Sequence, residues 1–111
     1  MLDRRNNISE LPKGLFRKQH QLREIDLPRN EIKKLNRRIF LGASRVEVVN
    51  LERNRLERLE ENVFAGLVNV TQLYLARNQL MLIDRTAFRD LTNLEILDLN
   101  DNRLRDLIHL H

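Results

Sequence analysis

The residues of this sequence best suited to chemistry are three histidines, two of which lie close together at the end of the chain. If that segment is a strand, His109 and His111 lie on the same side of it, a spacing that can hold a metal ion. Solvent-exposed histidines in a tail explain the same pattern, and we favour that interpretation. The sequence has no cysteine and therefore no thiolate nucleophile or thiolate metal ligand. We expect neither a metal nor another cofactor.

No arrangement of residues typical of catalysis is visible. The 16 acidic residues are scattered along the chain, no glycine-rich phosphate loop is present, and no nucleophile stands beside a base. The 20 basic residues are mixed with the acidic ones, so the net charge of +4 is not concentrated in one block. Such mixing predicts mild steering of acidic partners and no nucleic-acid surface. The sequence predicts a binding protein and not an enzyme.

The organisation of the chain becomes visible when its asparagines and phenylalanines are counted. Asparagine recurs every 24 residues, and all 4 phenylalanines follow the same period. Branched apolar residues recur at fixed distances from both. Such self-similarity is the signature of a solenoid, in which each unit stacks on the next. The two columns are Asn6, Asn30, Asn54, Asn78 and Asn102, and Phe16, Phe40, Phe64 and Phe88.

Each column of the repeat has a physical reason. In LREIDLPRN, Ile25 and Leu27 alternate with polar residues, which predicts a short strand with one face in the core. Asn30 follows where the chain turns away, and its amide can donate to and accept from backbone groups left unpaired there. Losing one such amide would cost on the order of 1–3 kcal/mol. We therefore expect the asparagines to form a structural ladder and the phenylalanines to fill the convex side of the core.

Written out, the unit is L-x-x-L-x-L-x-x-N-x-L-x-x-L-x-x-x-x-F-x-x-L-x-x, and it can be read from Leu22, Val46, Val70 and Leu94. This pattern resembles the leucine-rich repeat in its 24-residue form, and NLEILDLNDNRL is similar to segments of Toll-type receptors and Slit-like proteins. The resemblance implies one α/β solenoid over residues 1–111, with residues 1–21 as a partial unit and about four to five repeats in all. We expect a curved horseshoe fragment with a short-stranded parallel sheet on its concave face and irregular or 3-10 returns on its convex face.

The concave face is the best candidate binding surface, because solenoids present an extended curved sheet to protein ligands. Its acidic residues contrast with the basic chain as a whole. Tyr74 is expected at mid-sheet beside Val48 and Ile96, where it either anchors a ligand or packs among its neighbours on an unoccupied face. The candidate ligand-binding residues are Glu24, Asp26, Val48, Asn50, Glu52, Gln72, Tyr74, Ile96, Asp98 and Asn100.

A column of arginines runs beside the predicted sheet at the same step and is interrupted by Asp101. These arginines either form a basic rim that contacts a charged protein or fold back onto nearby acids as weak ion pairs, and we favour the ion pairs. Met81 and Leu82 replace charged residues of the other units, and local packing explains them better than a contact patch. The predicted rim consists of Arg29, Arg53 and Arg77.

Two N-glycosylation sequences, NIS and NVT, begin at Asn7 and Asn69, both expected to be exposed. They favour the cell exterior, as the resemblance does, whereas the lack of cysteine suits a reducing compartment. We therefore expect an extracellular or cell-surface protein, with a cytoplasmic one as the alternative. No apolar run is long enough to cross a membrane, so any membrane attachment would come from parts outside this chain.

Both ends of the repeat array depart from the pattern. Asp3 stands at a core position, and His111 stands where a branched apolar residue is expected. Because secreted members of the family usually close such arrays with cysteine-bearing caps, we interpret the chain as a piece of a longer ectodomain whose uncapped ends could self-associate. The resemblance implies non-enzymatic recognition of a protein ligand or co-receptor in signalling or adhesion. An intracellular scaffold and a module that binds anionic polymers are the alternatives.

Overall fold

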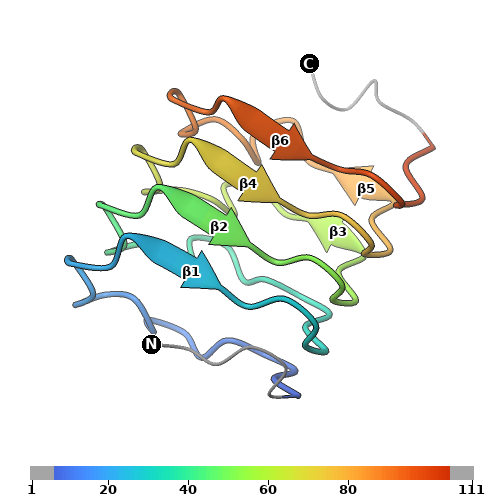
Figure 1. Cartoon of the computed structure of the whole chain (residues 1–111), viewed down its shortest axis with the longest axis horizontal. Coiled ribbons are helices and arrows are strands. Elements are labelled where there is room, and N and C mark those ends of the chain that lie inside the picture. The colour runs from blue at the N-terminus through green and yellow to red at the C-terminus, as the bar shows by residue number, and fades with distance from the viewer. Residues whose placement is uncertain (1–6, 106–111) are drawn as a thin grey trace.

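The computed structural model describes residues 7–105, which contain six short strands and no helix. Four of the strands form one parallel sheet, and every pairing joins residues 24 positions apart, as in Ile25 with Val49. Each coil of the chain therefore adds one strand, and the predicted solenoid is confirmed (Figure 1). In sheet order, the strands are β1 (Glu24–Asp26), β2 (Val48–Asn50), β4 (Gln72–Tyr74) and β6 (Ile96–Asp98).

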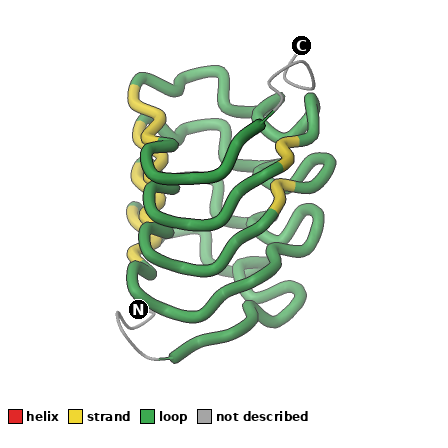
Figure 2. Tube along the Cα trace, turned by 90° about the vertical axis from the view of Figure 1, so that its right-hand side faces the viewer, coloured by secondary structure: helices red, strands yellow, loops and turns green. Residues whose placement is uncertain are grey.

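A second parallel sheet of two strands lies across the coil from the first, as Figure 2 shows. It consists of β3 (Arg58–Leu59) and β5 (Leu82–Ile83), paired in register. The sequence pattern does not predict these strands, because a two-residue strand is too short to show alternation. Their pairing arises because equal coils stack with backbone groups facing one another.

The chain returns on the convex side through successive tight turns. In the first of these returns, Leu15 N–H donates to Pro12 O at 3.1 Å and Arg17 N–H donates to Gly14 O at 3.1 Å. Gly42 has φ +106 and lies so close to the Phe16 carbonyl that a Cβ would clash with it. Glycine is therefore required there for neighbouring coils to approach.

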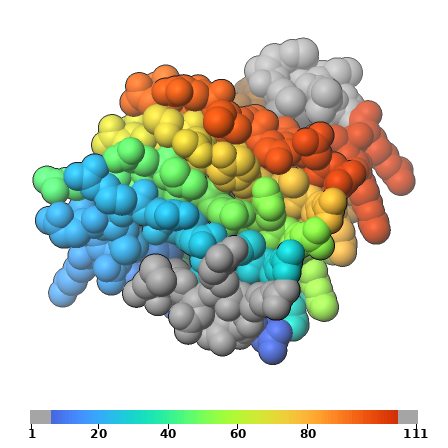
Figure 3. All heavy atoms as spheres, in the orientation of Figure 1, coloured from blue at the N-terminus to red at the C-terminus, as the bar shows by residue number. Residues whose placement is uncertain are grey.

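The core is built from columns of apolar residues at equivalent positions in successive coils, and one of these columns consists of phenylalanine alone. Phe16, Phe40 and Phe64 are almost completely buried, and the rings of all four phenylalanines stack with centroids 5.6, 5.7 and 6.0 Å apart. Burial decreases in the last described coil, where Leu97 is 39% exposed although Leu73, its equivalent one coil earlier, is fully buried. Figure 3 shows the coils as successive bands across the sheet side of the molecule.

The asparagine column joins each coil to the one before it. Asn54 Oδ1 accepts the N–H of Ile32 at 3.2 Å, and its Nδ2 donates to Leu27 O and Leu51 O, both at 3.0 Å. The side chain thereby satisfies backbone groups of two coils in a nearly dry environment, since Asn54 is only 6% exposed. Equivalent bonds are made by Asn30, Asn78 and Asn102, whereas Asn6 lies outside the described residues.

Candidate functional site

The four-stranded sheet presents two outward rows of side chains, with one residue from each strand in each row. Because alternate residues of a strand face opposite sides, Ile25, Val49 and Leu73 point into the core and their neighbours point outward. Every outward residue is half-buried or exposed. The structure therefore brings the candidate residues on the strands together on one surface, which we call the concave face. The rows are Glu24, Val48, Gln72 and Ile96, and Asp26, Asn50, Tyr74 and Asp98.

Tyr74 lies half-buried in the second row, on one of the two inner strands of the sheet. Its hydroxyl donates to Gln72 Oε1 at 2.7 Å, which directs the ring back along β4 toward the first row. In that row Val48 and Ile96 flank Gln72, and Ile96 is 44% exposed. The concave face therefore has a small apolar centre that contains its only aromatic ring.

Two polar residues of the second row also support the ends of their own strands. Asn50 Oδ1 accepts the backbone N–H of Glu52 at 3.0 Å, and Asp98 Oδ1 accepts that of Asn100 at 3.0 Å. Each of these side chains is therefore held by the turn that follows its strand. With the acidic groups nearby they place negative charge and hydrogen-bond acceptors beside the apolar centre. The acidic residues are Glu24, Asp26, Glu52 and Asp98.

The predicted arginine rim lies just beyond the strands, on exposed residues with an unusual backbone. Arg29, Arg53 and Arg77 all have φ 57, a left-handed conformation more common for asparagine, aspartate and glycine. Arg77 Nε is 3.4 Å from Asp101 Oδ2, and both side chains are more than half exposed, at 54% and 69%. Water screens such a pair, so it adds little to stability.

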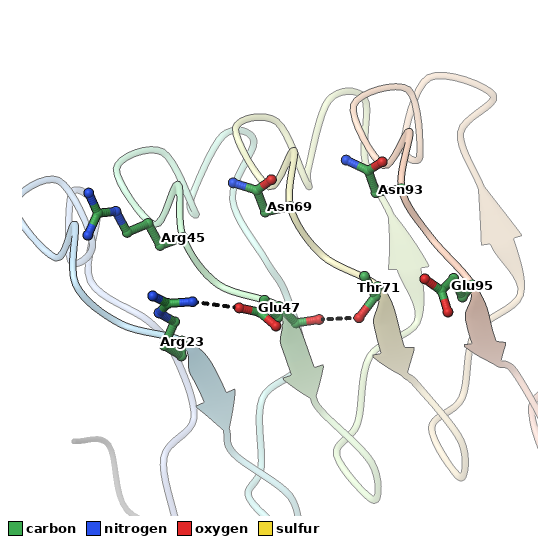
Figure 4. Close-up of a pocket in the computed structure, with 7 residues that line it drawn as sticks. All are labelled: Arg23, Arg45, Glu47, Asn69, Thr71, Asn93 and Glu95. Atoms are coloured by element: carbon green, nitrogen blue, oxygen red, sulfur yellow. Dashed lines mark hydrogen bonds and ion pairs between the residues drawn. The ribbon is translucent and has the colours of Figure 1, made fainter.

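A polar groove of about 550 Å³ runs across the N-terminal ends of the four parallel strands, whereas the arginine rim lies beyond their C-terminal ends (Figure 4). Arg23 Nη1 donates to Glu47 Oε2 at 2.8 Å across two coils, and both side chains remain largely exposed. Sequence reasoning missed this groove, although its polar positions recur with the repeat. Its residues form two columns, Arg23, Glu47, Thr71 and Glu95, and Arg45, Asn69 and Asn93.

The groove contains a second, exposed series of asparagines that links neighbouring coils. Asn69 Nδ2 donates to Ser44 O at 2.7 Å, and Asn93 Nδ2 donates to Val68 O at 2.8 Å. Asn69 is also one of the two glycosylation candidates, and it is exposed, as is Asn7. A glycan on Asn69 would therefore stand in the groove itself.

Polar side chains on the convex side tie the last described convex return to the one before it. Asp84 Oδ1 accepts the N–H of Thr86 at 2.8 Å and its hydroxyl at 2.7 Å. These bonds, the backbone one foremost, lower the pKa of the Asp84 carboxyl below its ordinary value. The Thr86 hydroxyl in turn accepts the N–H of Asn62 at 3.1 Å, and Asp90 accepts that of Gly66 at 2.9 Å.

Met81 and Leu82 lie on the same side and are 37% and 43% exposed. Met81 N–H donates to Glu57 O at 2.9 Å, and Leu82 belongs to β5, so the backbone there is fixed while the side chains remain accessible. His109 and His111 lie outside the described residues. Within residues 7–105 no three histidine or acidic side chains converge on a point that could hold a metal ion. The same part of the chain has no helix long and apolar enough to span a bilayer.

Comparison with known proteins agrees with this architecture. A family model described as leucine rich repeat matches residues 20–80 and 71–109. No match is found among curated proteins. A solved structure titled "Crystal structure of TLR13-ssRNA13 complex" is similar with a TM-score of 0.89 and 32% sequence identity. The similarity covers 93% of this chain but 14% of that one, so the chain corresponds in length to a small section of that receptor. The chain belongs to the leucine-rich repeat family.

Proposed function

We propose that the chain recognises a protein, and that its concave face binds a basic segment of the partner that carries one apolar side chain. The observation that supports this most directly is the apolar centre of Tyr74, Val48 and Ile96 with carboxylates on the same face of the sheet. None of these outward side chains is part of the buried core. Binding surfaces are typically organised in this way, with a central aromatic anchor and a polar surround.

Charge distinguishes this proposal from recognition of nucleic acid. The similar TLR13 structure is described as a complex with an ssRNA. In this chain the concave face carries Glu24, Asp26, Glu52 and Asp98, and phosphates brought to that face would meet like charge. Lysine and arginine side chains of a protein ligand would instead be attracted to it.

We further propose that the chain is a non-enzymatic part of a cell-surface receptor or of a secreted signalling or adhesion protein. The exposed sequons at Asn7 and Asn69 and the similarity to a Toll-like receptor support this setting. Expression through a secretory pathway followed by glycosidase digestion tests it, with a mass decrease expected at one or both sites. Secreted protein without glycan at Asn7 and Asn69 would favour the intracellular scaffold.

Selection of displayed peptides on the folded chain tests the concave face. We expect enrichment of peptides with lysine or arginine on both sides of an apolar residue, and loss of their capture by Tyr74→Ala. Arg85→Ala, on the exposed convex side, is the matched control and should leave capture unchanged. Enrichment of peptides without basic residues would contradict the proposal, as would tighter capture of a single-stranded RNA oligomer that Tyr74→Ala abolishes.

A further inference from the structure

A second cavity, smaller than the polar groove, lies on the convex side between the returns of the first two coils. Its volume is about 240 Å³. Among the residues within 7–105 that line it, four carry cationic side chains and none carries a carboxylate. Apolar surface is contributed by Ile39, which is 3% exposed, and by Leu41. The cations are Lys13, Arg17, Arg37 and Arg38.

The positive charge of this pocket is weakly neutralised by the protein. Arg37 has Glu61 as a partner, but the two atoms are 3.6 Å apart and the side chains are 67% and 51% exposed. Ion pairs of that kind are strongly screened by water. Arg17 lies over Gly14, since a Cβ built on that glycine would meet Arg17 Nη2 at 3.7 Å. Like charges held around one pocket repel one another, and an anion between them would relieve that repulsion.

Backbone conformation does not explain the arginine at position 38. Gly14, Arg38 and Asn62 occupy the same place in successive coils and have φ 73, 56 and 54. Glycine and asparagine tolerate this left-handed conformation, whereas arginine is less suited to it. Arg38 shares this conformation with Arg29, Arg53 and Arg77, so the turn accepts arginine without requiring it.

The corresponding convex returns of the later coils differ in charge. Glu60 and Glu61 occupy the places of Asn36 and Arg37 one coil later, and Asp84 follows Glu60 in the next coil. Arg85 brings a cation back to the place of Arg37 in the last of these returns, but it stands beside Asp84, so cations without a neighbouring acid at these places are found in the first two coils.

We propose that this pocket binds a small ligand that carries a phosphate or sulfate group. The planar guanidinium groups of Arg17, Arg37 and Arg38 can donate paired hydrogen bonds to such an oxyanion, and Lys13 adds a point charge. Ile39 and Leu41 would contact the carbon skeleton of the ligand. The volume is below the range of about 300–1,000 Å³ typical of drug-sized ligands, which suits a single sugar-sized group. This site is separate from the concave face and does not depend on the function proposed for it.

Titration with inorganic phosphate, followed by NMR at the backbone amides of Gly14 and Arg38, tests the site. We expect saturable shifts, with an apparent affinity for phosphate that falls when sulfate competes for the same pocket. Arg38→Asn should weaken phosphate binding about tenfold while the turn is retained, because asparagine accepts this backbone conformation. Arg89→Asn removes the same charge from the last convex return and should leave the affinity unchanged.

Glucosamine 6-phosphate and glucosamine 6-sulfate then distinguish the two sources of the oxyanion. Tighter binding of either, lost in Arg38→Asn, supports the pocket and identifies the ester it prefers. Shifts that do not saturate would overturn the proposal, as would equal weakening by Arg38→Asn and Arg89→Asn, which is the behaviour of diffuse charge attraction. If thermal melting shows that Arg38→Asn is unfolded, Arg17→Gln replaces it with the same expected tenfold loss.

Discussion

The middle of the repeat array and its C-terminal end, from Phe88 to the last described residue, have the same repeat columns but differ in how completely those columns are enclosed. Leu73 is fully buried, whereas Leu97, which pairs with it in the sheet, is 39% exposed. Phe64 is fully buried, and Phe88 in the next coil is half-buried although the two rings stack at 6.0 Å. The stability that a residue in a solenoid column contributes therefore depends on whether coils cover it on both sides and not on its residue type alone.

The largest expected effect of this difference is on the phenylalanine column. Phe64→Ala should lower the free energy of unfolding by about 3–5 kcal/mol, because it opens a cavity between two coils. Phe88→Ala should cost roughly half as much, about 2 kcal/mol, because the Phe88 side chain is partly exposed to water in the folded protein. Urea denaturation of both variants measures the two values. Equal losses of unfolding free energy in the two variants would show that the burial of a phenylalanine does not determine how much it stabilises the fold.

In the asparagine column, too, substitution of the buried member should cost more stability than substitution of the half-buried one, although both costs should be smaller than for phenylalanine. Asn54→Ala leaves the buried N–H of Ile32 without its acceptor and should cost about 1–3 kcal/mol. Asn102→Ala should cost less than about 1 kcal/mol, because Asn102 is half-buried and water can replace its bond to Leu80 N–H. Urea denaturation midpoints of the two variants measure these costs. A larger loss for Asn102→Ala than for Asn54→Ala would contradict the prediction.

Acid should affect the last convex return through Asp84. Since folding lowers the pKa of this carboxyl, its contribution is present above the ordinary value of 3.8 and is lost as the pH falls through the folded value. Asp84→Asn should therefore lower stability at pH 7, where the contribution of the carboxylate is present, and approach the unsubstituted protein as the pH falls below the folded pKa, so that part of the acid-induced loss disappears. Thermal melts between pH 2 and pH 7 test this. An unchanged acid slope in Asp84→Asn would mean that the bonds to Thr86 do not stabilise the folded state.

The smallest effect on stability is expected at the centre of the concave face. Tyr74→Phe removes only the bond to Gln72 and should change the free energy of unfolding by less than about 1 kcal/mol. Capture of displayed peptides should weaken if the hydroxyl contacts the partner and persist if only the ring does. A large loss of stability would show instead that Tyr74 serves the fold.

The repeat columns predict much of the fold, but they predict less about what the surface residues do. The spacing of Asn30, Asn54 and Asn78 predicted stacked coils with parallel strands, because only a regular stack aligns residues of one type at equal intervals. The pairing of β3 with β5 was not predictable, since two residues carry no periodic signal. The concave residues lie on one face, but their role in binding stays a prediction.

The two pockets escaped sequence reasoning for a common reason. Arg23 and Glu47, like Gly14 and Arg38, belong to different coils and meet only when the coils stack. Columns indicate which residues are neighbours along the stack, but the shape of each turn decides whether their side chains enclose a cavity.

The sequence by itself determined the period, the buried columns and hence the solenoid, because the hydrophobic effect and the need to satisfy backbone groups act on every repeat in the same way. Only the tertiary structure decided how deeply each member of a column is buried, and where Lys13, Arg17, Arg37 and Arg38 gather around a cavity. Those outcomes depend on the spacing and turn geometry of neighbouring coils, which bring together side chains that lie about one repeat apart in the chain.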